Sequence, residues 1–413
     1  MQDENLDDHA IVIKYAGDGS RLWTRSLAGE PYAVGVVTRA DDSVVVATET
    51  RLFALTSTGE ITYSGPSSEG FVFQRNGLGI SAEGSIGFAA NILGTARRGV
   101  GGVLHDDLTV AWLREVDDLA AKTVSRTISA DLAGNWLLGG TVVVETIDQG
   151  DAGIREIYGG FLRKYDANGE LLWSRAIPSP DDNYGYHLTA VRPNAVNEPV
   201  TLGILTNSGA VDAPNMVITT FDEAGQLIDQ NTLPSSDAAV YGRDLVVTPE
   251  GDRIVAGIRF PGHPLTAYGF VSRYSSAGDM KWDYRNALIP ARAADFAALR
   301  ADVQGDLFAV GYQVLEEAPR AKILVCKIRR KSAHPRSLDN SYQEREYNHV
   351  SAQLLPGSSC WCLMPFGRGQ MYPTVSLWTA ITRRTMAIMI ARTAAGNGHS
   401  RPRSSRGRVR DRR

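Results

Sequence analysis

The chain has 413 residues, 43% of them hydrophobic and 22% charged, which is the balance of a folded protein large enough for a repeat array. Its net charge of −3 hides an asymmetry. Residues 1–330 carry 29 basic and 42 acidic side chains, a net of −13, whereas residues 331–413 carry 14 and 4, a net of +10. The acidic body would repel nucleic acid and anionic membranes, so we expect neither as its partner.

Cysteines and apolar runs are too few for a disulfide framework or a membrane span. Only Cys326, Cys360 and Cys362 occur, and no uncharged apolar run reaches about 18 residues. The first ten residues, MQDENLDDHA, are acidic and polar and contain no apolar signal core, so no export signal is present in the sequence as given. We expect residues 1–10 to be disordered.

A β-hairpin pattern begins at Ile11–Leu27 and has its clearest copy at Phe161–Ile177, FLRKYDANGELLWSRAI. One strand runs to a tight turn at Gly169, a residue that tolerates positive φ, and a second strand runs back. Tyr165 lies four residues before Gly169 and Trp173 four residues after it. We expect the two rings to meet across the strands.

The same hairpin recurs along the chain at spacings of 40–61 residues, about 52 on average. The other copies are Leu52–Gly65, Gly102–Val116, Val217–Leu233 and Phe270–Asn286. The position of Trp173 in the repeat is occupied by Trp23, Tyr63, Trp112, Asp229 and Trp282. Because aromatic rings contribute large contact areas, we also expect these positions to pack between neighbouring repeats.

A second motif, a polar or glycine turn followed by an apolar run, fills each interval between hairpins. The copies begin at Asp41, Glu83, Gly134, Asn197, Gly251 and Gly305. The runs are almost continuously apolar, which suits strands that are covered on both faces, and the hairpins carry more charge, as strands near a rim should. Each repeat therefore contributes two inner and two outer strands. Four strands every 40–60 residues predict the blade of a β-propeller.

We therefore predict an all-β fold over residues 11–328, a β-propeller of six four-stranded blades. The hairpin Ile11–Leu27 precedes any inner pair, so we expect it to complete the last blade beside Ala301–Val314 and to close the ring. The apolar segment Lys322–Lys327 competes for the same place. A seventh, incomplete blade is the alternative.

Residues 329–413 form a basic, low-complexity tail in which the repeat stops abruptly. One interpretation is a basic arm for nucleic acid or acidic surfaces. The favoured interpretation is a disordered or aberrant segment, such as one produced by a change of reading frame. The part 374–393 contains Arg383-Arg384 and is at best a surface helix.

Two motifs resemble ligand-binding loops. Residues 76–82, NGLGISA, match G-x-G-x-x-A, but a strand rather than a helix follows, so a turn is favoured over a dinucleotide site. Asp166–Glu170 presents oxygen atoms at alternate positions, as calcium loops do, but the distal glutamate is missing. Turn chemistry is favoured there too.

Metal ligands and catalytic residues are equally weakly indicated. Cys360 and Cys362, with His349 or His399, form a C-x-C set without a second pair. His187 lies near the start of an inner strand, where it lines the channel or, as we favour, is a solvated or hydrogen-bonded loop histidine. We therefore assign no catalytic, cofactor-binding or metal-binding residue and expect no cofactor.

The segments KYAGDGSRLWTRSL, RKYDANGELLWSRAI and SRYSSAGDMKWDYRN resemble the K/R-Y-D-x-x-G-x-x-L-W repeats of bacterial β-propeller repeat proteins, which are common in secreted or surface lipoproteins of myxobacteria-like organisms. The Gly-to-Trp spacing is also similar to the tryptophan-docking repeat of quinone-dependent dehydrogenases and of their non-catalytic relative in outer-membrane protein assembly. The resemblance covers roughly residues 10–328. It implies an exported protein in the periplasm, in the outer membrane or outside the cell.

From these features we expect a monomeric, non-catalytic interaction or scaffold module of the bacterial cell envelope. It would hold an unidentified protein or glycan through loops at one face. The alternative is a propeller enzyme, a quinone-type dehydrogenase or a metal-dependent hydrolase, with its site in the central channel. The body contains no adjacent cysteine pair and no assignable calcium–quinone set, so the non-catalytic function is favoured.

Overall fold

The computed structural model describes most of the first 328 residues and three short segments beyond them. The described ranges are 10–16, 20–30, 33–66, 70–92, 98–117, 122–148, 154–180, 184–206, 215–233, 239–260, 267–285, 291–302, 305–315, 321–328, 348–352, 375–381 and 385–392. Within them the regular structure is β-sheet, and no helix is long and apolar enough to cross a membrane.

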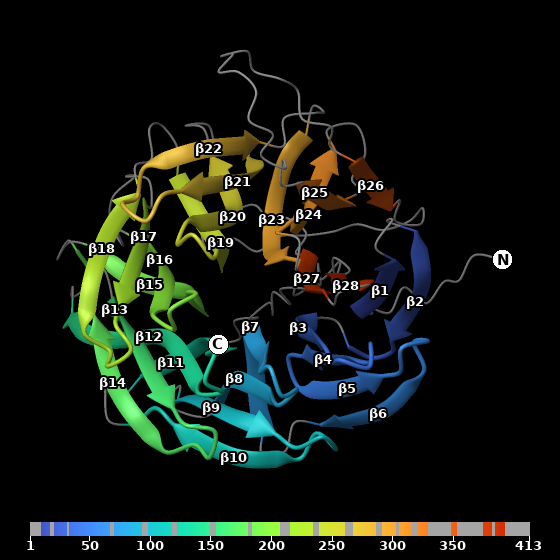
Figure 1. The fold of residues 1–413 in the computed structure, drawn as a ribbon, viewed down its shortest axis with the longest axis horizontal. Helices are drawn as coiled ribbons and strands as arrows, with labels where there is room; N and C mark the ends of the chain where they lie inside the picture. The colour runs from blue at the N-terminus through green and yellow to red at the C-terminus, as the bar shows by residue number, and fades with distance from the viewer. Residues whose placement is uncertain are drawn as a thin grey trace, which may run out of the picture.

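Seven four-stranded antiparallel sheets are arranged as blades around one axis (Figure 1). Blade one contains β3 (Ala33–Thr38), β4 (Val44–Thr48), β5 (Arg51–Leu55) and β6 (Ile61–Pro66). Blade two contains β7 (Phe71–Ile80), β8 (Ile86–Ile92), β9 (Arg98–Leu104) and β10 (Val110–Glu115). Blade three contains β11 (Thr123–Ala130), β12 (Trp136–Asp148), β13 (Ile154–Tyr165) and β14 (Leu171–Ile177).

The remaining blades continue around the ring, and only the last one joins both ends of the chain. Blade four contains β15 (Gly185–Pro193), β16 (Pro199–Thr206), β17 (Asn215–Phe221) and β18 (Leu227–Leu233). Blade five contains β19 (Ala239–Val247), β20 (Arg253–Phe260), β21 (Tyr268–Tyr274) and β22 (Met280–Arg285). Blade six contains β23 (Ala291–Ala301), β24 (Leu307–Leu315), β25 (Ala321–Ile328) and β26 (Asn348–Ala352). Blade seven contains β1 (Ala10–Ala16), β2 (Arg21–Leu27), β27 (Val375–Ile381) and β28 (Thr385–Arg392).

Burial follows the division into inner and outer strands that the sequence predicted. Every residue of β4 is buried, whereas most residues of β2 and several of β14 are exposed. The apolar runs therefore lie between neighbouring blades, where both faces of a sheet are covered. The outermost strands lie at the rim (Figure 1). This confirms the all-β propeller and the two-inner, two-outer plan.

The N-terminal hairpin closes the ring, as predicted, but its partner is different. Strand β1 pairs with β28, with Tyr15 opposite Met386, and not with the inner pair of blade six. That blade has its own third strand, β25, which contains the segment Lys322–Lys327. Strand β27 contacts both β23 and β3, so blade seven lies between blades six and one. The described strands thus give seven sheets, the larger of the two numbers that the sequence left open.

Three strands lie within residues 329–413, where the sequence predicted a disordered or aberrant tail. These are β26, β27 and β28; β27 and β28, the described parts of 374–393, pair as antiparallel strands, so the expectation of a surface helix there is wrong. Strand β28 reads TMAIMIAR, a short run of apolar residues bounded by Thr385 and Arg392, which suits a strand as well as a helix turn. Arg383-Arg384 falls between the two strands, outside the described residues, and does not interrupt either strand.

Candidate functional site at the axis of the ring

Most innermost strands share an irregularity in their pairing with the next strand. In four blades one residue of the innermost strand is skipped, a β-bulge, and in blade six two residues are skipped. The skipped residues are Val34, Arg126, Thr189, Arg243, Arg292 and Ala297. Blade two has a larger interruption, because Phe73 pairs with Ala90 and the next pair is Leu78 with Phe88. Four residues, 74–77, are therefore left out of that ladder.

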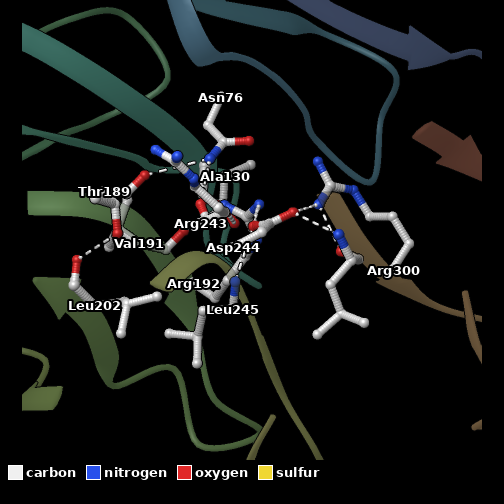
Figure 2. Close-up of polar contacts among 12 residues, drawn as sticks. Asn76, Ala130, Thr189, Val191, Arg192, Leu202, Arg243, Asp244, Leu245 and Arg300 are labelled. Carbon is white, nitrogen blue, oxygen red and sulfur yellow. Dashed lines mark hydrogen bonds and ion pairs between the residues drawn. The ribbon is translucent and has the colours of Figure 1, made fainter. Parts of the chain in front are cut away.

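Asn76, within this four-residue interruption, crosses the axis. It adopts a φ of 56°, a left-handed conformation that asparagine tolerates better than most residues. Its Nδ2 donates hydrogen bonds to the carbonyl oxygens of Thr189 at 3.3 Å and Arg243 at 3.0 Å (Figure 2). Those residues belong to blades four and five, and blade three separates them from blade two. A contact of this kind is available only at the centre of the ring.

Asp244, the residue after Arg243, links three neighbouring blades. Its buried carboxylate accepts four hydrogen bonds, and in Figure 2 it lies between two arginines. Oδ1 accepts from Arg192 Nη2 at 2.7 Å and from the backbone N–H of Leu245 at 2.9 Å. Oδ2 accepts from the backbone N–H of Leu299 at 3.0 Å and from Arg300 Nη1. Strands β15, β19 and β23 are thereby tied together at their innermost positions.

The electrostatics of this triad leave one positive charge. Burial acts to raise the pKa of Asp244, but Arg300, Arg192 and two backbone N–H groups outweigh it and hold that pKa below its usual value. Burial, followed by the proximity of Arg300, lowers the pKa of Arg192 to about 10, although Asp244 opposes this. Two guanidinium groups face one carboxylate. Their side chains remain 17% and 26% exposed for Arg192 and Arg300, so solvent reaches both.

A second arginine–aspartate pair lies on the same innermost strands. Nε of Arg243 lies 3.3 Å from Oδ2 of Asp295, whose side chain is 5% exposed. The Oδ1 atom of Asp295 and the Oδ1 atom of Asn76 are both buried without a hydrogen-bond partner among the described residues. Arg75, next to Asn76, is exposed. Because Arg192 and Arg300 face the single carboxylate of Asp244, the described residues of the axis have an excess of positive charge and two acceptors without a described donor, although the body as a whole is acidic.

The blade seams carry a second recurring arrangement, built on Trp-x-Arg. Trp173 Nε1 donates to the carbonyl oxygen of Glu223 at 2.9 Å, and Arg175 Nε donates to that of Gly225 at 2.7 Å, both in the next blade. Blades seven and one, and blades two and three, are joined in the same way by Trp23 with Arg25 and Trp112 with Arg114. This confirms that the aromatic positions of the repeat pack between blades.

The expected contact between Tyr165 and Trp173 within one hairpin is wrong. The register pairs Trp173 with Lys164 and Tyr165 with Leu171, because a bulge shifts the ladder between Lys164 and Tyr165. Tyr165 instead packs against Trp112 of the preceding blade, with ring centroids 5.8 Å apart. Spacing along the sequence placed the rings correctly at a seam but gave each the wrong partner.

A groove of about 380 Å³ lies on the seam between blades two and three. It is lined by Leu113, Arg114, Glu115, Asp117, Arg163, Tyr165 and Leu171. Arg114 is already committed to the carbonyl oxygen of Gly169, and Arg163 donates to the carbonyl oxygen of Glu115. The groove is therefore the outer side of a blade seam, formed by the same residues that hold the two blades together.

One of the two loop motifs of the sequence is a turn between strands, and the other is the end of a strand followed by a turn. Oδ1 of Asp166 accepts hydrogen bonds from the backbone N–H groups of Asn168 and Glu170, each at 2.8 Å, as a turn aspartate does. Residues 76–80 lie in β7 itself, and a turn at 81–85 connects them to β8, so no helix follows. The interpretation of Asp166–Glu170 as a turn is confirmed, whereas residues 76–80 belong to a strand and the turn begins only at Ser81.

His187 lies on β15 against Tyr158, with ring centroids 4.8 Å apart. It is a partly buried strand residue rather than a loop histidine, and burial, followed by Arg126, lowers its pKa to about 4. Cys360, Cys362 and His399 lie outside the described residues, and only the backbone of His349, in β26, is described. Within the described ranges no three His, Cys, Asp or Glu side chains gather as a metal site would require.

No family model and no curated protein matches this chain. Solved structures do, at low identity. The WD40 domain of Pan2 from Neurospora crassa is 11% identical, with 88% of this chain and 90% of that one covered and a TM-score of 0.44. BamB from Moraxella catarrhalis is 10% identical, with 86% and 96% covered and a TM-score of 0.39.

Proposed function

We propose that this protein is a non-catalytic β-propeller that acts as an interaction or scaffold module. It holds a protein or glycan partner through the loops at one face of the ring. The proposal rests on the hydrogen bonds that the carboxylate of Asp244 accepts. All four of its hydrogen bonds come from arginines and backbone N–H groups. A carboxylate saturated in this way stabilises the ring and has no lone pair left for proton transfer or for a metal ion.

An enzyme of the quinone-dependent or metal-dependent class is the competing function. Such a site needs several acidic or histidine side chains that converge with free lone pairs. The acidic side chains described at the axis are Asp244 and Asp295, and each is paired with arginine. Arginines at these positions would oppose the binding of a cation, which favours the non-catalytic function.

Metal and cofactor analysis of the purified full-length chain tests the proposal. The full chain is required because β26, β27 and β28 complete blades six and seven, so a fragment ending near residue 330 lacks part of the ring. We expect less than a tenth of an equivalent of Ca²⁺ or transition metal and no quinone absorbance. A stoichiometric amount of either would refute a non-catalytic module.

The location and assembly state are part of the same proposal. The repeat resemblance supports export to the cell envelope or beyond, and we propose that the protein acts there as a monomer. Cell fractionation with a tagged full-length gene product tests the location, and light scattering after size-exclusion chromatography tests the assembly state. Recovery in the cytoplasmic fraction, or a mass of twice 44.7 kDa, would contradict these two statements.

A further inference from the structure

We propose that the axial cluster, defined as Asn76, Arg192, Asp244 and Arg300, binds a small polyhydroxy carboxylate, that is, a sugar acid. This deepens the proposed function and rests on it, because it names a ligand class for a non-catalytic module. The charge of the cluster, its hydrogen-bond acceptors without a described donor and the space at the axis each favour this ligand class.

The charge of the cluster selects an anion. Arg192 and Arg300 share the single carboxylate of Asp244, which leaves one positive charge without an ion pair among the residues that the structure describes. Each guanidinium has five N–H donors, and their bonds to Asp244 and to the carbonyl oxygens of Val191 and Leu299 do not use them all. A ligand carboxylate that reaches the exposed parts of these groups would accept charge-assisted hydrogen bonds.

The buried acceptor atoms without a described donor favour a ligand that carries hydroxyl groups. Asn76 is 6% exposed, and both hydrogen-bonded contacts of its carboxamide go through Nδ2, which fixes the orientation of the amide. Oδ1 is left without a donor among the described residues. In Figure 2 this oxygen points away from both carbonyls, to the side on which Arg300 lies. The carbonyl oxygen of Arg243 accepts a hydrogen bond from Asn76, and the next residue, Asp244, binds Arg192 and Arg300. The Oδ1 atom of Asn76 and the two arginines therefore belong to one site.

A second buried acceptor supports the same choice. Oδ1 of Asp295, on the innermost strand of blade six, also lacks a donor within the described chain. A buried acceptor without a partner costs free energy, so a ligand that donates to it gains affinity. Simple anions such as acetate or phosphate at neutral pH offer few donors. A sugar acid offers both a carboxylate and several hydroxyl groups.

The position of Asn76 across the axis limits the size of the ligand. Its side chain bridges blade two to blades four and five, so a polymer cannot pass along the centre at that level. The occupant is therefore a single sugar acid or the end of a chain that terminates in one.

Calorimetric titration of the full-length protein with sodium glucuronate tests the inference, with glucose and acetate as matched ligands. We expect glucuronate to bind at least tenfold more tightly than either, because each control carries only one of the two recognised features. The variants Arg192→Gln and Arg300→Gln should each weaken glucuronate binding by about tenfold or more. Arg300→Lys, which keeps the charge, should restore part of the affinity and guards against loss of folding.

Arg98→Gln is the control variant, because Arg98 is an exposed rim residue paired with Glu115 and should leave binding unchanged. Equal affinity for glucuronate and glucose, equal affinity for glucuronate and inorganic phosphate, or unaltered binding in the folded Arg192→Gln and Arg300→Gln proteins would each overturn the inference. Those failures leave a metal-free, quinone-free module intact. Conversely, stoichiometric metal or quinone would refute the proposed function whatever the sugar-acid result.

Discussion

The indole ring of Trp173 lies directly on Gly225 of the next blade. A Cβ atom added to Gly225 would lie 2.7 Å from Cδ2 of the indole, closer than side chains ever approach. Gly225 also has a φ of 78°, which disfavours any other residue. Trp112 covers Gly169 in the same way, with a separation of 2.6 Å. The turn glycine of the repeat is therefore required by its backbone and by its neighbour at once.

Gly225→Ala should destabilise the protein by about 3 kcal/mol, because backbone strain and the clash with Trp173 add together. Urea unfolding of the full-length chain measures this. Gly251→Ala is a matched control, since Gly251 has a φ of 83° but nothing within 4 Å of the added Cβ. It should cost about 1 kcal/mol from strain alone. Equal losses in the two variants would show that the indole contact does not matter.

Asp244→Asn should destabilise the protein by about 3–5 kcal/mol, because two arginines would then face each other without their shared carboxylate. Urea unfolding at pH 7 is again the measurement. Asp166→Asn removes a carboxylate from an exposed turn in which asparagine can accept the same hydrogen bonds, and it should change stability by less than about 1 kcal/mol. A tolerated Asp244→Asn would mean that the triad does not hold blades four to six together.

His187 should make the protein sensitive to mild acid. The unfolded chain binds a proton on this histidine near pH 6.5, whereas burial, with Arg126, delays protonation in the folded state to about pH 4. Stability is therefore complete above pH 6.5 and falls as the pH drops toward 4, by about 2 kcal/mol between pH 7 and pH 5. His187→Phe keeps a ring against Tyr158 and should remove that loss. An unchanged pH dependence in the variant would contradict the assignment.

Truncation after residue 330 should prevent cooperative folding, because it removes β26, β27 and β28 and leaves β1 without its inner partner. Loss of a single sharp thermal transition, together with aggregation through unpaired strand edges, is the expected result. A chain ending at residue 393 retains every described strand and should melt as the full chain does. Cooperative unfolding of the shorter fragment at an unchanged temperature would refute the role of blade seven in closing the ring.

The blades could be predicted from sequence because local and long-range preferences agree in them. Continuous apolar runs such as β4 lie between sheets, and the glycine turns recur at a regular spacing. A seventh blade was only the alternative, and its strands β27 and β28 could not be predicted because they lie in a basic, low-complexity segment without the glycine–aromatic pattern of the other hairpins. The basic, low-complexity composition of this segment favoured disorder, although it contains short apolar runs.

The axial site could not be read from any one segment. Asp244 pairs with arginines 52 and 56 residues away, about one blade in each direction, so its role appears only when three blades are compared. In the sequence Asn76 stands only in a glycine motif, whereas its contacts across the axis depend on the four residues that interrupt the pairing of β7 with β8. A comparison of the inner strands for insertions and for arginines at equivalent positions would have indicated both.

The pairing of β1 with β28 places the first and last of the described strands in one sheet. During synthesis on the ribosome, blades one to five can assemble in order as they emerge, but the first hairpin has no inner neighbour until the final strands are released. The growing polypeptide therefore carries an exposed β-edge throughout translation, and a chaperone or an export pathway that delays folding would protect it.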